Sequence, residues 1–231
     1  EAIFTVSEFS KSRIAEWGRV PHETIVVVGN GVSQSFSPEG DRWEGTDRPY
    51  FLYVGNHKPH KNTSGLIEAF GQSGLQREMD LLLTGFPTPE LEVLVASLSL
   101  DESVRFLGLV DEPTLAALYR GTRALILPSW YEGFGLPLVE AMASGAPVLS
   151  SNRSSLPEIG GDAVRYFDPG QPESLVEGLR QFETETSSDF LRQKGLDRAK
   201  TFNWDQVATR IQGALETRGQ RLFESSSSSA P

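Results

Sequence analysis

The 231-residue sequence contains no cysteine, which excludes disulfide bonds and thiolate metal sites. No apolar run is long enough to span a bilayer, and the first residues lack the pattern of a secretory signal. Neither an internal repeat nor a D-x-D sequence is present. We therefore expect a cytoplasmic protein, and membrane contact is not indicated in this segment.

Acidic residues outnumber basic ones: the chain has 31 Asp and Glu against 21 Lys and Arg, which gives a formal net charge of -10. Such a charge repels phosphate backbones and anionic lipids, which argues against nucleic acid or an anionic membrane as a partner. A local cluster of basic residues is therefore informative. Hydrophobic residues make up 38% of the chain, which is enough for a globular core.

Short apolar runs alternate with helix-compatible segments along most of the chain. We expect strands at residues 50–54, 80–84, 103–107, 123–127 and 147–150, and helices at 64–72, 90–98, 112–119 and 138–144. Three further helices are expected at residues 173–182, 188–200 and 203–217. Alternation at this spacing predicts an α/β fold, namely a Rossmann-like parallel sheet with helices on both faces.

Ligands of such sheets bind beyond the carboxyl ends of the strands. Each of the five expected core strands is followed by a glycine or a serine, at Gly55, Gly85, Gly108, Ser129 and Ser151. These positions are therefore expected to share one rim, where residues far apart in the sequence can converge.

The beginning of the chain has its own pattern. Residues 3–6 predict a strand, and Ser7 or Ser10 can cap a helix that follows it. A second strand is expected at residues 25–28, before a turn at residues 30–31 with the sequence Asn-Gly. Because the chain opens inside a strand and without methionine, we expect it to be a fragment of a longer protein.

The stretch at residues 127–160 is the most informative part of the sequence. A strand-like run ends at Pro128, and Gly133 and Gly135 then tolerate unusual φ angles and close backbone approach. Pro137 suits the first position of a helix. A glycine-rich turn that opens a helix leaves backbone N–H groups free, and such an end forms an anion site.

Two carboxylates bracket this turn, Glu132 in the loop and Glu140 in the first turns of the helix. Glu140 can reach a sugar ring or a ribose whose phosphates lie on the N-terminal amides. The alternatives are that Glu140 only complements the helix dipole and that Glu132 is an exposed loop charge.

A second candidate anion site lies at residues 56–62. Two of the three histidines and two lysines, including Lys61, occur there just before a helix N-terminus. The helix dipole disfavours cations at that end. Basic residues that lie there in spite of the dipole, in so acidic a chain, favour an anionic ligand. The alternative is a solvated, turn-rich loop.

Taken together, these segments resemble a known family. Residues 132–137, 140–145, 147–148 and 154–158 resemble, in order, the E-x7-E signature of retaining glycosyltransferases of the GT-B fold. The match is specifically to family 4, the group 1 glycosyltransferases. Weaker matches near the ends extend the resemblance over residues 1 to about 217, although Gly29 and Ser33 replace the usual proline and aspartate.

The resemblance implies a division of the chain. Residues 1–23 would be the tail of an N-terminal domain with the interdomain linker, and residues 24–203 a Rossmann-like donor-binding domain. Residues 204–218 would form a C-terminal helix, and residues 219–231, which include a serine run, a disordered tail. The expected partners are a nucleoside-diphosphate sugar and the missing N-terminal GT-B domain, which carries the acceptor site and the family's catalytic histidine.

The family's motifs also assign site residues. The resemblance implies that Lys61 grips the donor diphosphate beside Gly55 and Asn56, where many members have arginine in place of Asn56. Glu132 would hold the sugar hydroxyls, and Lys61 and Glu132 are the expected catalytic residues. The other implied donor contacts are Leu109 and Val110 at the base, Gly133, Phe134, Gly135 and Leu136 at the diphosphate, and Glu140 at the ribose. We expect neither a metal nor a cofactor.

The activity implied is transfer of a hexose (mannose-, rhamnose- or glucose-like) from a nucleoside-diphosphate sugar with retention of configuration, in polysaccharide biosynthesis. Two alternatives remain, a non-catalytic nucleotide-binding subunit of a split enzyme and another GT-B activity such as a sugar phosphorylase or epimerase. The chain alone is expected to bind nucleotide but to transfer nothing. Ser155 and Glu158 have the spacing of a capping box, with a ligand contact as the alternative.

Overall fold

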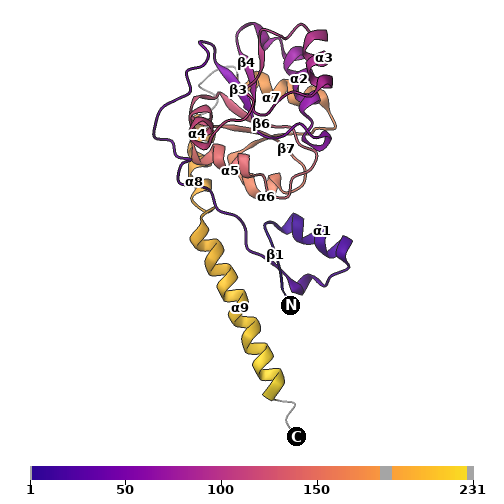
Figure 1. Ribbon diagram of the computed structural model, residues 1–231, viewed down its shortest axis with the longest axis vertical. Coiled ribbons are helices and arrows are strands. Elements are labelled where there is room, and N and C mark those ends of the chain that lie inside the picture. Colours follow the sequence, from indigo (N-terminus) through magenta and orange to yellow (C-terminus); the bar gives the residue numbers. More distant parts are fainter. Residues whose placement is uncertain (1, 183–188, 228–231) are drawn as a thin grey trace.

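The computed structural model describes residues 2–182 and 189–227. Its centre is a six-stranded sheet in the order β5-β4-β3-β6-β7-β8, with every neighbouring pair parallel (Figure 1). The strands are β3 (Tyr50–Tyr53), β4 (Asp80–Leu83), β5 (Val104–Phe106), β6 (Ala124–Leu127), β7 (Val148–Ser151) and β8 (Arg165–Phe167). This confirms the predicted α/β fold with a parallel sheet.

Helices cover both faces of the sheet. They are α2 (Thr63–Ser73), α3 (Pro89–Ser97), α4 (Glu112–Gly121), α5 (Leu136–Ala143), α6 (Leu156–Gly160), α7 (Pro172–Gln181) and α8 (Asp189–Ala199). In Figure 1, α2, α3 and α7 lie together on one side of the sheet, and α4, α5 and α6 on the other. Most of the predicted bounds differ from these by only one or two residues.

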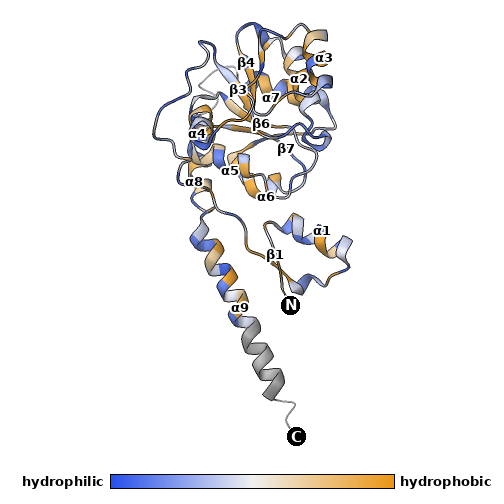
Figure 2. Cartoon of the chain, viewed as in Figure 1, coloured by the Kyte–Doolittle hydropathy of each residue, from blue (hydrophilic) through white to orange (hydrophobic). Residues whose placement is uncertain are grey.

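Successive side chains along the central strands pack alternately into two apolar cores, one on each face of the sheet. Phe51 and Ile126 belong to the core under α2, α3 and α7, whereas Leu52 and Leu125 belong to the core under α4 and α5. A strand that is buried on both faces reads as a continuous apolar run rather than as an alternating pattern. This is why β3, β4 and β6 were recognisable from the sequence, and β6, with the sequence Ala-Leu-Ile-Leu, is coloured as hydrophobic in Figure 2.

Strand β8 was missed. It has three residues, Arg165–Phe167, and lies at the sheet edge, where Leu149, Ser150 and Ser151 of β7 pair with it. An edge strand this short with a charged first residue has no apolar run to distinguish it from a loop. Helix α6 was missed for a similar reason, because its five residues are fewer than the two turns that a periodic pattern needs.

The N-terminal segment stands apart from the main sheet. Strands β1 (Ile3–Thr5) and β2 (Ile25–Val27) pair in parallel in a separate two-stranded sheet, joined through α1 (Glu8–Gly18). Figure 1 shows this unit beside the body that contains the six strands. Strand β2, which the prediction assigned to the donor-binding domain, is thus hydrogen-bonded to β1 of the preceding segment. The domain boundary between residues 23 and 24 stays a prediction.

The last helix is longer than predicted. Helix α9 runs from Trp204 to Ser227 and leaves the main body (Figure 1), whereas we expected a helix to about 217 and a disordered tail at 219–231. The segment 220–224 is rich in residues with high helix propensity, and the helix continues through it into the serine run, as far as Ser227. Residues 228–231 lie outside the described part.

Truncating a side chain at the centre of the sheet should destabilise the fold. Leu125 in β6 is fully buried, so Leu125→Ala is expected to lower the free energy of unfolding by about 2–5 kcal/mol. Val93→Ala in α3 is the control, because Val93 is 70% exposed and its loss should change stability by about 0.5 kcal/mol or less. Urea unfolding measures both, and equal effects would contradict this arrangement of the core.

Candidate functional site

The loops after the central strands meet at one rim of the sheet. Gly85, after β4, and Gly108, after β5, form an antiparallel bridge in which each amide donates to the other's carbonyl at 2.7 and 3.2 Å. Both have positive φ angles (86° and 67°), which glycine adopts without strain. The Gly55 amide, after β3, donates to Thr84 Oγ1 at 3.1 Å. The predicted convergence of these loops is confirmed.

An ion pair joins the loops after β3 and β6. Lys61 ends a short 3-10 helix, Pro59–Lys61 (η2), and its Nζ lies 2.6 Å from Oε1 of Glu132. The two side chains are only 17% and 11% exposed. Ser129 Oγ donates to the same carboxylate oxygen at 2.8 Å. The structure therefore brings together the two residues predicted to be catalytic, although 71 positions separate them in the sequence.

Backbone and side-chain hydrogen bonds also join the loop after β3 to the loop after β6. The Trp130 amide donates to His60 O at 2.8 Å, and Asn62 Nδ2 donates to Pro128 O at 3.2 Å. Asn62 occupies the N-cap position of α2 but makes no capping hydrogen bond. Its side chain instead contacts the residue that follows β6.

The Glu132 backbone is anchored on its other side by two serines that follow β7. Its amide donates to Ser154 Oγ at 2.9 Å, and its carbonyl accepts from Ser155 Oγ at 2.9 Å. Ser151 Oγ also donates to Ser129 O at 2.6 Å. The sequence analysis placed Ser129 and Ser151 on the rim but gave neither a partner, and no local signal identifies these long-range contacts.

The glycine-rich turn opens α5 as predicted. Gly135 is the N-cap residue and has a φ angle of 96°; a Cβ added there would lie 2.7 Å from Leu156 Cδ2. In the described part of the chain, the amides of Phe134, Gly135 and Leu136 donate to no acceptor. Free amides at a helix N-terminus are an anion-binding arrangement.

Ser155 and Glu158 do not form a capping box. Ser155 lies at the N-cap of α6 without a capping hydrogen bond, because its hydroxyl donates to Glu132 O instead. The Glu158 carboxylate accepts from the amides of Glu8 and Phe9, at 2.8 and 3.1 Å. Tertiary partners have thus replaced the local ones, and Glu158 caps the helix of a distant segment.

Comparison with known proteins identifies the family. Residues 41–197 match the family described as "Glycosyl transferases group 1". The chain belongs to the group 1 glycosyl transferases. It is 33% identical to O-antigen chain mannosyltransferase B of Escherichia coli over 93% of its length, and 32% identical to an MMP alpha-(1->4)-mannosyltransferase of Mycolicibacterium hassiacum over 93%. It spans only 60% and 53% of the lengths of these relatives.

Solved structures share the fold of this group 1 glycosyl transferase chain. A sucrose-phosphate synthase from Thermosynechococcus elongatus superposes with a TM-score of 0.79 at 24% identity, covering 97% of this chain and 59% of that one. A glycosyltransferase from Rickettsia africae gives 0.80 at 18% identity, covering 96% and 64%. At these identities the likeness establishes the Rossmann-like GT-B architecture alone.

The predicted ribose ligand, Glu140, has a partner within this family fold. Its Oε2 accepts from Tyr119 OH of α4 at 2.9 Å. Burial raises the pKa of the Glu140 carboxyl, and the Tyr119 hydrogen bond opposes that rise. Burial and the neighbouring Glu140 also raise the pKa of Tyr119. Glu140 is therefore more than a surface charge on the helix dipole, and its contact with ribose remains a prediction.

The other predicted donor contacts are exposed at the rim. Asn56 is exposed, and its Oδ1 accepts from the Lys58 amide at 3.3 Å. Leu109 is 85% exposed, whereas Val110 packs partly on the core. Phe86, which no sequence pattern indicated, is 69% exposed and adjoins Gly108. In the part of the chain that the structure describes, none of these four side chains is hydrogen-bonded to Lys61 or Glu132.

His57 does not contribute a cation to the basic cluster. Its ring stacks on Tyr53, with centroids 5.7 Å apart, and its Nδ1 lies 3.3 Å from Thr63 Oγ1. Burial lowers the pKa of His57, which favours the neutral ring. Of the cluster, Lys61 alone forms the ion pair with Glu132, while Lys58 and His60 are exposed.

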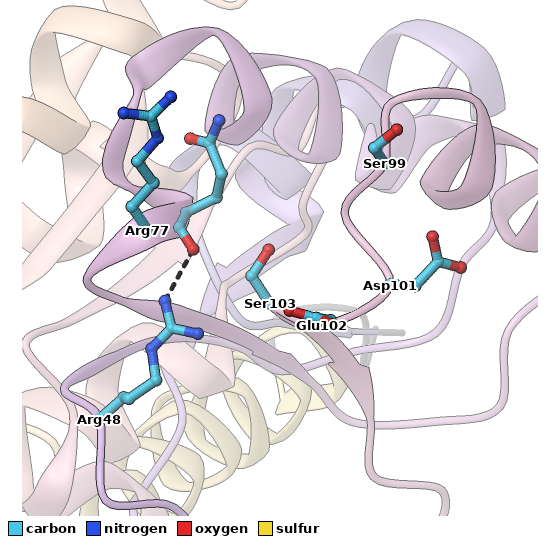
Figure 3. Close-up of a pocket in the computed structure, with 7 residues that line it drawn as sticks. Arg48, Arg77, Ser99, Asp101, Glu102 and Ser103 are labelled. Atoms are coloured by element: carbon cyan, nitrogen blue, oxygen red, sulfur yellow. Dashed lines mark hydrogen bonds between the residues drawn. The ribbon is translucent and has the colours of Figure 1, made fainter.

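A hollow lies at the opposite end of the strands from this rim. It has a volume of about 620 Å³ and is lined by Arg48, Gln76, Arg77, Ser99, Asp101, Glu102 and Ser103 (Figure 3). These residues precede β3, β4 and β5, so they surround the amino ends of the strands. Arg48 is already engaged, because its Nη2 donates to Gln76 O at 2.7 Å and its Nη1 lies 3.2 Å from Asp80 Oδ1.

Two remaining predictions concern membranes and metals. None of the helices among the described residues is both long and apolar enough to cross a bilayer. Within residues 2–182 and 189–227, no group of three or more His, Cys, Asp or Glu side chains is placed to hold a metal ion. A cytoplasmic location and metal-independent chemistry stay predictions.

The raised pKa of Glu140 has a consequence for stability. The Glu140 carboxyl keeps its proton to a higher pH in the folded chain than in the unfolded chain. The free energy of unfolding therefore falls as the pH rises from the ordinary glutamate pKa to the higher pKa of Glu140 in the folded chain. Glu140→Gln stays neutral and still accepts from Tyr119, so it should raise the melting temperature more at pH 7 than at pH 4.

The matched control is Glu92→Gln in α3, where the side chain is exposed and no such pH-dependent gain is expected. Calorimetry at both pH values, without nucleotide, measures the two variants. A gain for Glu140→Gln that is equal at pH 4 and pH 7 would show that burial does not disfavour the charged carboxylate.

Proposed function

We propose that this chain is the donor-binding half of a retaining glycosyltransferase that transfers a hexose from a nucleoside-diphosphate sugar. The observation that carries the proposal is the Lys61–Glu132 ion pair, 2.6 Å long, in the loops that adjoin the glycine-rich turn. Free amides at the start of α5 supply donors for phosphate oxygens. A cation, a set of amides and a carboxylate are the groups needed to bind a sugar diphosphate.

The reaction breaks the bond between the anomeric carbon and the diphosphate oxygen, and the electron pair stays on the departing diphosphate. An acceptor hydroxyl then bonds to the anomeric carbon on the same face and gives its proton to the departing diphosphate oxygen. Lys61 and the amides of Phe134, Gly135 and Leu136 would stabilise the charge that develops on the diphosphate, because they are held in place before the reaction. Glu132 would bind the sugar hydroxyls, and Glu140 the ribose.

Mannose is the leading candidate for the transferred sugar. Two relatives named mannosyltransferases are 32–33% identical to this chain over 93% of its length, and one of them is named for O-antigen chains. We infer that a further N-terminal domain supplies the acceptor site, since the resemblance places it there and this chain spans 60% or less of those relatives. By itself the chain would bind donor nucleotide without transferring the sugar.

The proposal predicts specific binding of one nucleoside diphosphate. GDP, UDP, dTDP and ADP should be tested by thermal shift and calorimetry, and the preferred one at 100 times its Kd should stabilise the chain by about 2.7 kcal/mol. Lys61→Ala should weaken binding roughly 10- to 100-fold, which is the value of a hydrogen bond to a charged group. Lys58→Ala, at an exposed neighbour, should stay within about twofold of wild type.

Three results would contradict this function. The first is that none of the nucleotides shifts the melting temperature, and the second is that Lys61→Ala and Lys58→Ala bind the preferred nucleotide equally well. Robust transfer by the isolated chain from a radiolabelled nucleotide sugar would instead refute the claim that it is only the donor-binding half.

A further inference from the structure

The first turn of α1 contacts the phosphate-binding turn directly. Ser7 Oγ and Ser10 Oγ both donate to the carbonyl oxygen of Gly133, at 2.6 and 2.9 Å. The two serines precede Gly133 by 126 and 123 residues. Ser7 is fully buried, although it lies in the segment whose strands form a separate sheet. Two hydroxyls thus converge on one carbonyl of the turn.

The geometry of the peptide bond turns this contact into a constraint on the site. A trans peptide is planar, so its C=O and N–H groups point in opposite directions. The Gly133 carbonyl and the Phe134 N–H belong to one peptide unit, so holding the first toward α1 points the second away from α1. Ser155 acts likewise on the Glu132 carbonyl, and hence on the Gly133 N–H.

Other contacts hold the first turn of α1 in place. The Glu158 carboxylate accepts from the amides of Glu8 and Phe9, and negative charge at a helix N-terminus is stabilising. The rings of Phe9 and Tyr131 meet edge to face, with centroids 5.2 Å apart. These contacts attach the start of α1 to Tyr131 and to Glu158 of α6, so the serine hydroxyls have a defined direction.

We propose that Ser10, together with Ser7, is a positioning residue that orients the Phe134 amide toward the diphosphate of a bound nucleotide. The inference rests on the proposed donor site and adds a requirement to it. An amide already aligned for an anion loses less freedom on binding than one that must be ordered by the ligand. The N-terminal segment therefore completes a site whose ligand-contacting groups all lie in the larger domain.

Replacing Ser10 separates positioning from direct contact. Ser10→Ala removes one of the two hydroxyls on Gly133 O and should weaken binding of the preferred nucleoside diphosphate about 2- to 12-fold, the value of one hydrogen bond. Binding of the matching nucleoside, which has no phosphate, should be unchanged. Ser10→Thr keeps a hydroxyl and should restore diphosphate affinity to within about twofold of wild type.

Ser12→Ala is the matched control in the same helix. Ser12 is exposed, and its hydroxyl donates only to Glu8 O of its own helix, at 3.1 Å. We expect nucleoside-diphosphate affinity within about twofold of wild type for this variant. Ser7 is less suitable as a single test, because its hydroxyl also accepts from the Ser10 amide as the N-cap of α1.

NMR titration of the whole chain gives the required readouts, because it reports the Kd values and the Phe134 amide resonance. In Ser10→Ala the ligand-free Phe134 amide should shift, and its change on adding diphosphate should shrink. Equal loss of nucleoside and diphosphate affinity would mean that Ser10 is merely structural, and unchanged diphosphate affinity would also overturn the inference. If wild type binds no diphosphate, or Lys61→Ala binds as well as wild type, the proposed function itself fails.

Discussion

The ion pair between Lys61 and Glu132 is the interaction on which the arrangement of the rim depends. Both side chains are largely buried, and a buried charge without its partner is strongly unfavourable, by about 3–5 kcal/mol when one member is removed. Each loop therefore needs the other to neutralise it. In the absence of an anion, the Glu132 carboxylate holds Lys61 Nζ in place, and Ser129 donates to the same carboxylate oxygen. A diphosphate would offer Lys61 a second partner in a position that is already prepared.

The topology of the sheet explains why this pair can form. The chain builds β3, then β4 and β5 on one side, and returns to place β6 on the other side of β3. The order of strands thus reverses between β3 and β6, which are direct neighbours. Loops that leave such a reversal diverge over opposite faces and leave a crevice at the carboxyl ends, where ligands of open α/β sheets bind. Lys61 follows β3 and Glu132 follows β6, so the two come from the strands on either side of that crevice.

Much of the fold and part of the site could be predicted from the sequence. The buried strands were recognisable because burial on both faces leaves uninterrupted apolar runs such as 124–127. In the turn before α5, Gly135 has a steric reason, because its φ angle is 96° and an added Cβ would lie 2.7 Å from Leu156 Cδ2. Edge strand β8 had no such run. Ser155 and Glu158 were misjudged because their spacing suggested each other as partners, whereas Glu132 and the α1 amides compete more favourably. Such long-range choices leave no local pattern.

A structure of the chain with its preferred nucleoside diphosphate would test the central claim most directly. We predict diphosphate oxygens within about 3 Å of Lys61 Nζ and of the Phe134 and Gly135 amides, with Gly133 O still bonded to the α1 serines. A diphosphate bound instead in the hollow beside Arg48 and Arg77, with the Lys61–Glu132 pair intact and the α5 amides empty, would contradict the account.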